Sequence, residues 1–201
     1  GRSTEVLGRV LEIISKDTLD TFLEKNIFKP LNMKDTGFFV EESEWSRLAE
    51  PFYNKEPKLI NVRKKPNFLT GGHGLVSTVD DYLNFCNMLL KKGIVNDKIF
   101  LSKKTVEFMT SNQLGKNIKR NKSSYLPGIE YGFGLGLAVR EIENKYSFLE
   151  SKGEYFWSGY AGTYFWIDPK KELIVIFLTQ SVINKTKFRI LLRDIVYKSI
   201  I

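Results

Sequence analysis

The sequence predicts an α/β sandwich of the α+β class, in which helices flank an antiparallel sheet. Three observations lead to this fold class. Helical periodicity marks the start and the middle of the chain, β-branched and aromatic runs fill the last third, and the final segment returns to helical spacing. No internal repeat or clear linker interrupts this order, so the 201 residues fit one domain or a piece of a larger one.

Two amphipathic helices are predicted at the start of the chain. The first carries apolar side chains at helical spacing over residues 6–14. The second follows a capping residue at Asp17 or Thr18 and ends near Lys29, because the residue before a proline disfavours helix. Residues 31–70 combine strong turn signals with little periodicity, which predicts irregular structure.

Two further helices are predicted in the middle of the chain. Thr78 and Asp81 form a capping-box pattern, and the helix that they start ends at Gly93, a residue typical of left-handed C-caps. A shorter helix starts at Ser102. Cys86, the only cysteine, lies on the apolar side of the longer helix, which favours a buried structural thiol over a nucleophile.

The last third has the pattern of a sheet followed by a helix. Residues 131–139 alternate glycine with large apolar residues, which predicts one strand whose face is closely approached by another group. Residues 162–167 and 173–179 are joined by a turn at 168–172 and predict an antiparallel hairpin. The second run is apolar on both faces, so we expect a central, covered strand. A closing helix is predicted to lie across the sheet through Phe188, Leu191, Leu192, Ile195 and Ser199.

Charge and hydropathy argue against a nucleic-acid partner and a membrane span. The net charge is +8, but the basic residues are scattered among acidic ones. The densest stretch, Lys116–Lys122, has no aromatic residue for base stacking and is typical of a solvated loop. No apolar run reaches the roughly 20 residues of a membrane-spanning helix. The sequence leaves the cellular compartment open.

Neither a metal nor a cofactor is predicted. His73 is the only histidine, and with one cysteine it does not form a zinc-ligand pattern. The phosphate-binding loop motif Gly-x-x-x-x-Gly-Lys does not occur, and Gly132, Gly134 and Gly136 have the wrong spacing for a dinucleotide fingerprint.

No serine of the chain has the sequence context of an activated nucleophile. None has a lysine three residues later, although Ser-x-x-Lys would place both groups on one helical face, and no Gly-x-Ser-x-Gly motif occurs. The best candidate site is residues 156–163, where small residues flank two aromatics beside a strand. Glycine there would let a ligand reach the backbone, whose N–H groups could stabilise an oxyanion. A bulge or tight corner with a packed tryptophan is the alternative interpretation.

Five segments, in this order, resemble the serine β-lactamase-like hydrolases, a group that includes class C β-lactamases, penicillin-binding proteins and related esterases. The esterase branch is more similar than the true β-lactamases. The segments are Glu5–Val10, Ile27–Gly37, Gly71–Tyr82, Tyr131–Gly136 and Gly162–Pro169.

The resemblance implies a β-lactamase/transpeptidase-like fold and three active-site motifs. Trp157-Ser158-Gly159 matches the third motif, and the backbone N–H of Tyr160 would then be one of two oxyanion donors. The Ser-x-x-Lys motif and a catalytic tyrosine would lie before residue 1, as would the first strands and helix. Residues 1–201 would therefore be the C-terminal portion of such a domain, with its N-terminal portion missing.

The functional expectation is a serine hydrolase that cleaves a small-molecule ester or amide through an acyl-serine intermediate in the intact protein. Trp157, Ser158 and Gly159 would form one pocket wall, and Gly72 and His73 could line it, although an ordinary loop histidine fits equally well. The chain alone is expected to be inactive. The alternatives are a non-catalytic binding or interaction module, and half of a split hydrolase that a complementary N-terminal polypeptide completes.

Overall fold

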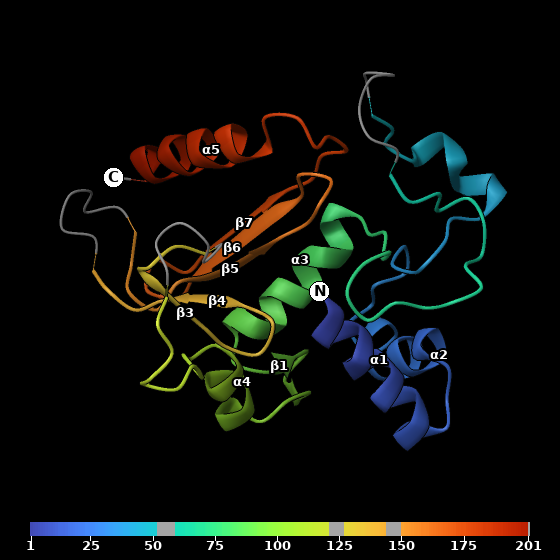
Figure 1. Cartoon of the computed structure of the whole chain (residues 1–201), viewed down its shortest axis with the longest axis horizontal. Coiled ribbons are helices and arrows are strands. Elements are labelled where there is room, and N and C mark those ends of the chain that lie inside the picture. Colours follow the sequence, from blue (N-terminus) through green and yellow to red (C-terminus); the bar gives the residue numbers. More distant parts are fainter. Residues whose placement is uncertain (52–58, 121–126, 144–149, 201) are drawn as a thin grey trace. The chain divides into compact units, whose positions relative to one another are not determined.

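The computed structural model describes residues 1–51, 59–120, 127–143 and 150–200 (Figure 1). The chain divides into two compact units. One contains residues 1–85 and 179–181, and the other, called here the sheet unit, contains residues 86–178 and 182–201. The two units are described separately below.

The first unit is built from short helices joined by irregular chain. Residues 31–70 have little regular structure where they are described, as predicted, apart from one 3₁₀ turn. The elements are α1 (Arg2–Ser15), α2 (Leu19–Leu23), which continues as the π-helix η1 (Glu24–Phe28), the 3₁₀ helix η2 (Glu42–Arg47) and the start of α3 (Val79–Leu90).

Helix α1 presents an apolar face to solvent. The helix begins at Arg2 with Gly1 as its N-cap, and it ends at Lys16 in the left-handed conformation. Large apolar residues over these turns are mostly exposed; they are Val6, Leu7, Val10, Ile13 and Ile14. The helical pattern predicted for residues 6–14 is therefore confirmed, but within this unit its apolar face has no full cover.

The predicted capping box of α3 is half formed. The N–H of Asp81 donates to the Thr78 hydroxyl at 3.3 Å, as the pattern requires. The Asp81 carboxylate instead accepts from the Asp35 N–H at 2.7 Å and the Thr36 hydroxyl at 2.8 Å. Because these partners lie more than forty residues earlier in the chain, the acidic residue joins an irregular loop to the start of the helix.

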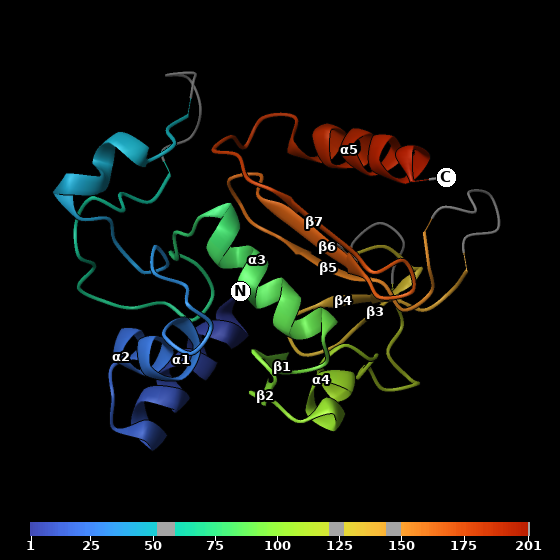
Figure 2. The same cartoon turned by 180° about the vertical axis from the view of Figure 1, so that it is seen from behind.

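The sheet unit contains a five-stranded antiparallel sheet in the order β3-β4-β5-β6-β7. In Figures 1 and 2, α5 covers one face of this sheet, and the end of α3 from Cys86 onward lies on the other side. This is the predicted antiparallel sheet flanked by helices. The bounds are β1 (Ile94–Val95), β2 (Lys98–Ile99), α4 (Lys103–Met109), β3 (Tyr131–Phe133), β4 (Ala138–Arg140), β5 (Tyr155–Ser158), β6 (Tyr164–Asp168), β7 (Leu173–Phe177) and α5 (Lys185–Ser199).

Three local predictions in this unit are confirmed. Ser102 caps α4, because its hydroxyl accepts from the Thr105 N–H at 3.0 Å. Gly93 follows α3 with a φ of 90°. The turn between β6 and β7 is closed by the Asp168 carboxylate, which accepts from the N–H groups of the two lysines that follow Pro169. Each of these features depends on contacts within a few residues.

The single strand predicted over residues 131–139 is wrong. The segment forms two strands, β3 and β4, that pair with each other around a turn in which Gly136 has a φ of 81°. The expected close approach is present, because a Cβ on Gly134 would lie 2.0 Å from the Met109 carbonyl oxygen and one on Gly132 would lie 2.2 Å from the Asn112 side chain. The glycines therefore accommodate both the turn and the chain that leaves α4.

Strand β7 is at the edge of the described sheet, so its predicted central position is wrong. It pairs with β6 alone among the described strands, and all five of its residues are half-buried. Leu173, Val175 and Phe177 pack toward the cluster beneath α5. An apolar run shows that a strand is covered on its faces, whereas strand order depends on partners remote in sequence.

Helix α5 lies across the sheet as predicted, but a different side of it faces inward. Phe188, Leu191 and Ile195 are about half exposed. Leu192 packs against the core as predicted, together with Val196, and Tyr197 is fully buried. The helix is rotated from the predicted orientation because cationic and tyrosine side chains, described below, find buried partners on the sheet.

Candidate active site

The predicted site residues Trp157–Tyr160 lie where β5 turns into β6. Ser158 pairs with Tyr164 in register, and the Gly159 N–H donates to the Thr163 carbonyl at 2.9 Å, so the ladder continues one pair beyond the strands. The Gly162 N–H closes the turn by donating to the Gly159 carbonyl at 3.3 Å. Four of the six predicted residues are thus brought together at one strand end.

Glycine is needed at two positions of this turn. A Cβ on Gly159 would lie 2.1 Å from the Thr163 hydroxyl, so the small residue permits the close pairing. Gly162 has a φ of 92°, a region that side chains disfavour. These contacts support the tight-corner interpretation of the motif. A tight corner can still leave a backbone N–H exposed, so these contacts are also compatible with the functional interpretation, in which such an N–H stabilises an oxyanion.

Arg189 of α5 holds the carbonyl groups of the turn. Its Nη2 donates to the Gly159 carbonyl at 2.8 Å and to the Thr163 carbonyl at 3.0 Å, and its Nε donates to the Gly162 carbonyl at 3.4 Å. The guanidinium also lies 5.6 Å from the centre of the Tyr164 ring. Burial lowers the pKa of Arg189 below its usual value, but a guanidinium remains charged.

The side chains of the motif have different surroundings. Tyr160 is 65% exposed, and Lys185 Nζ lies 4.6 Å from its ring centre while donating to its carbonyl at 3.0 Å. Trp157 packs edge-to-face on Phe133 with the ring centres 5.1 Å apart. Ser158 shares a sheet face with Tyr164, the face that α5 covers. Tyr160 and the backbone beside it are thus the accessible part of the motif.

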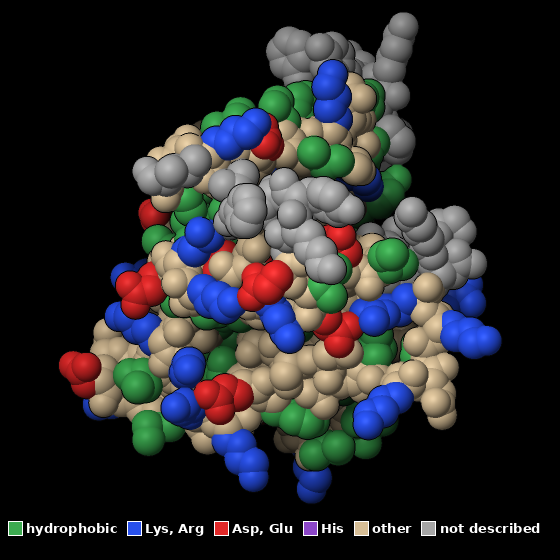
Figure 3. Space-filling model, turned by 90° about the vertical axis from the view of Figure 1, so that its left-hand side faces the viewer, with side chains coloured by type: hydrophobic (Ala, Val, Ile, Leu, Met, Phe, Trp, Pro, Cys, Tyr) green, Lys and Arg blue, Asp and Glu red, His purple; other side chains and the backbone are tan. Residues whose placement is uncertain are grey.

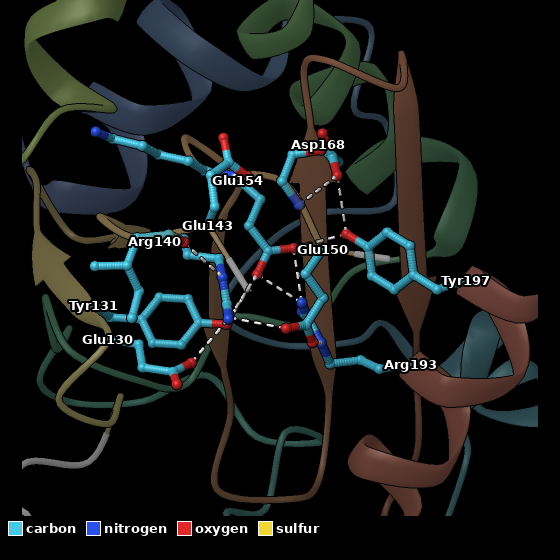
Figure 4. A network of polar contacts seen from close by, with 12 residues as sticks. Glu130, Tyr131, Arg140, Glu143, Glu150, Glu154, Asp168, Arg193 and Tyr197 are labelled. Atoms are coloured by element: carbon cyan, nitrogen blue, oxygen red, sulfur yellow. Dashed lines mark hydrogen bonds and ion pairs between the residues drawn. The ribbon is translucent and has the colours of Figure 1, made fainter. Parts of the chain in front are cut away.

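A buried polar network anchors α5 at the other end of β5 and β6 (Figure 4). The Glu154 carboxylate is fully buried and accepts from Arg193 Nη2 at 2.6 and 2.7 Å. The hydroxyls of Tyr131 and Tyr197 donate to the same carboxylate at 2.8 and 2.7 Å. Tyr197 also lies 3.1 Å from Asp168. Since Tyr131 and Tyr197 are buried and the Arg193 side chain is only 11% exposed, we interpret the network as structural.

A second arginine, Arg140, also belongs to the network, and the Glu150 carboxylate bridges it to Arg193. Glu150 lies 2.9 Å from Arg140 and 3.1 Å from Arg193. Burial alone would lower the pKa of Arg193, but the Glu154 carboxylate raises it above its usual value. Burial and the same carboxylate raise the pKa of Tyr197. Both groups therefore stay protonated and serve as hydrogen-bond donors.

The other two predicted residues, Gly72 and His73, belong to the first unit. A Cβ on Gly72 would lie 2.8 Å from Glu5 Oε1 and from the Thr4 hydroxyl, so this glycine allows the loop to pack on α1. His73 is exposed, and its Nδ1 lies 2.9 Å from Glu5 Oε1. These contacts give both residues a local structural role, and their place in a pocket stays a prediction.

Three features of the described residues bear on metal, membrane and nucleic-acid binding. No group of three or more potential ligands that could hold a metal occurs among them, and none of their helices is long and apolar enough to cross a bilayer. Cys86 is fully buried, and burial raises its pKa to about 12. Figure 3 shows one face on which basic and acidic side chains intermingle. Asn121 and Lys122 of the basic stretch lie outside the described residues.

Sequence reasoning missed Arg189 and Lys185. The available signal was their spacing with Arg193 and Tyr197, since residues four apart share one helical face. The apolar residues of the same helix form the stronger pattern in the sequence, and they predict a different face toward the sheet. The partners of the arginine and tyrosine side chains are the Gly159 carbonyl for Arg189, Glu154 for Arg193 and Asp168 for Tyr197. Only the tertiary structure shows these pairings.

Comparison with known proteins gives one consistent result. A family model described as Beta-lactamase matches residues 3–196. Protein Rv1367c of Mycobacterium tuberculosis (strain ATCC 25618 / H37Rv) is 32% identical over 187 residues, which are 88% of this chain and 47% of that protein. Lovastatin esterase of Penicillium rubens is 26% identical over 210 residues, which are 91% of this chain and 50% of that protein. The chain therefore spans about half the length of these relatives.

A solved structure supports the fold. The LovD6 mutant of simvastatin synthase from Aspergillus terreus superposes with a TM-score of 0.81 at 19% identity. The match covers 98% of this chain and 53% of the simvastatin synthase chain. At this identity the likeness concerns the fold alone.

Proposed function

The chain belongs to the Beta-lactamase family, and from this premise we propose that it supplies one wall of an esterase-like acyl-serine site. The substrate class is a small ester or amide. The intact protein would acylate a serine, and water would then release the acyl group. These 201 residues contain no Ser-x-x-Lys, so the nucleophile and its lysine would come from the remaining half of the domain.

One observation carries this proposal: the Trp157-Ser158-Gly159 motif ends β5 in a tight turn and leaves the next N–H available. Within the described residues, the N–H of Tyr160 donates no backbone hydrogen bond. A free N–H beside an accessible strand end is the group that an oxyanion needs. The second donor would be the N–H of the nucleophile. The esterase relative supports acyl chemistry over a purely structural role.

In this proposal the residues of the Trp157–Tyr160 segment have different chemical roles. As the serine attacks, negative charge develops on the carbonyl oxygen of the substrate, and the Tyr160 N–H stabilises it. Trp157 contributes apolar wall through its half-exposed ring. Ser158, on the face covered by α5, positions the strand and does not react.

Labelling with a fluorophosphonate probe tests the proposal. The protein of residues 1–201 is compared with the same chain extended upstream until a Ser-x-x-Lys segment is included. Ser158→Ala is made in both proteins as a control. We expect the extended protein alone to be labelled, with no effect of Ser158→Ala. Labelling of the protein of residues 1–201 that disappears in Ser158→Ala would make Ser158 the nucleophile and overturn the proposal.

A split or non-catalytic protein is the second candidate, and the exposed apolar surfaces favour it. Val6, Ile13 and Ile14 of α1 are more than 60% exposed, and the edge of β7 has no partner strand among the described residues. A complementary N-terminal polypeptide would cover such surfaces. If no upstream Ser-x-x-Lys segment exists, labelling after mixing with that separate polypeptide indicates a split hydrolase. If the mixture is not labelled either, the chain is interpreted as a non-catalytic binding module.

A further inference from the structure

Helix α5 controls the orientation of the peptide that carries the proposed oxyanion donor. The peptide between Gly159 and Tyr160 is trans, like every peptide of the described residues. In a planar trans peptide the C=O and N–H point in opposite directions. Because the Gly159 carbonyl points to Arg189 Nη2 at 2.8 Å, the Tyr160 N–H must point away from α5.

The neighbouring peptides are held from the same helix. Lys185 donates to the Tyr160 carbonyl at 3.0 Å, and Arg189 also reaches the carbonyls of Gly162 and Thr163. Lys185 and Arg189 are one helical turn apart, so both reach the turn from one face of α5. Four carbonyl groups of residues 159–163 are thereby fixed, which leaves the turn little freedom to rotate the peptide in between.

The position of α5 itself is set independently. Arg193, one turn after Arg189, is tied to the buried Glu154 carboxylate. Four residues of helix span about 6 Å, so anchoring Arg193 also fixes where Arg189 meets the strand end. Stability of the helix–sheet contact and orientation of the turn thus depend on different side chains. The two effects are separable by mutation.

We propose that Arg189 is a positioning residue that aims the Tyr160 N–H into the acyl site by holding the Gly159 carbonyl. This inference rests on the proposed function. Arg189 itself contacts neither substrate nor nucleophile. Its loss would let the peptide rotate, so that the oxyanion would lose a preorganised donor while the apolar wall for substrate binding stayed in place.

The kinetic test uses the protein that includes the upstream Ser-x-x-Lys segment, with p-nitrophenyl butyrate as the probe substrate. We expect Arg189→Met to lower kcat about 10- to 100-fold with KM nearly unchanged, somewhat less than the loss of a whole oxyanion donor. Arg189→Lys, which keeps one charged donor, should restore part of the rate. Lys187→Met removes an exposed cation from the same helix and should retain the parental kcat.

The second test uses NMR spectroscopy on residues 1–201 and does not depend on activity. In Arg189→Met, the ¹³C resonance of the Gly159 carbonyl and the amide resonance of Tyr160 should both shift, and Lys187→Met should move neither. Unchanged resonances would overturn the inference. So would a parental kcat in folded Arg189→Met or, if that variant fails to fold by circular dichroism, in Arg189→Lys. An inactive parent would refute the proposed function, and the resonances would still decide the role of Arg189.

Discussion

Replacing Glu154 by glutamine is expected to destabilise the sheet unit by about 3 kcal/mol. The two side chains have nearly the same size, so the substitution leaves no cavity and isolates the effect of the charge. Glutamine presents an N–H₂ group where the carboxylate now accepts from Arg193 and two tyrosines. At least one of these donors would then lose its acceptor in a buried place.

The magnitude follows from what remains after the change. Breaking a buried ion pair costs roughly 3–5 kcal/mol. Glu150 still lies 3.1 Å from Arg193 and 2.9 Å from Arg140, so the lower end of that range applies. Against a typical total stability of roughly 5–15 kcal/mol, such a loss is easily measured.

Urea unfolding followed by tryptophan fluorescence provides the assay. A Trp45→Phe background leaves Trp157 and Trp166, both in the same unit as Glu154, as the reporters. Glu107→Gln is the matched control, because the Glu107 carboxylate lies 3.5 Å from Lys92 with half of each side chain exposed. It should cost between zero and about 1 kcal/mol. A Glu154→Gln cost no larger than the control would refute the structural role of the network.

Two further predictions concern local features. Hydrogen bonding from Arg9 lowers the pKa of Glu12 below 4.5, so its contribution to stability is present above about pH 4.5 and is lost as the pH falls through the folded pKa. Urea unfolding at about pH 6 and about pH 3 should therefore show a smaller acid loss in Glu12→Gln than in the parent, and an equal loss would contradict the assignment. Gly136→Ala should cost about 1–2 kcal/mol, because the φ of 81° is left-handed but no atom lies within 4 Å of the new Cβ. Gly93→Ala should cost clearly more, because its Cβ would lie 2.1 Å from the Leu101 carbonyl oxygen, and equal shifts in Tm for the two variants would show that the clash is relieved.

The sequence predicted those parts of the site that are local. Trp157-Ser158-Gly159 lies beside a tight corner that precedes the strand β6, as the pattern of small and aromatic residues indicated. The strand β5, which this motif ends, was not predicted from the pattern. The family resemblance, carried by five segments in order, is confirmed by the family match over residues 3–196. What the pattern could not supply was the direction of the Tyr160 N–H, because that depends on Arg189, thirty residues further along the chain.

By itself, the sequence determined the family, the cap of α4 at Ser102, the C-cap at Gly93 and the hairpin around Asp168. Each of these depends on steric and hydrogen-bonding rules that act over a few residues. Only the tertiary structure decided that β7 lies at the edge of the described sheet, and that α5 faces the sheet with Arg189 and Arg193. Partners such as Glu154 and Arg193 are 39 residues apart, and a buried charge selects its partner by distance in the folded chain.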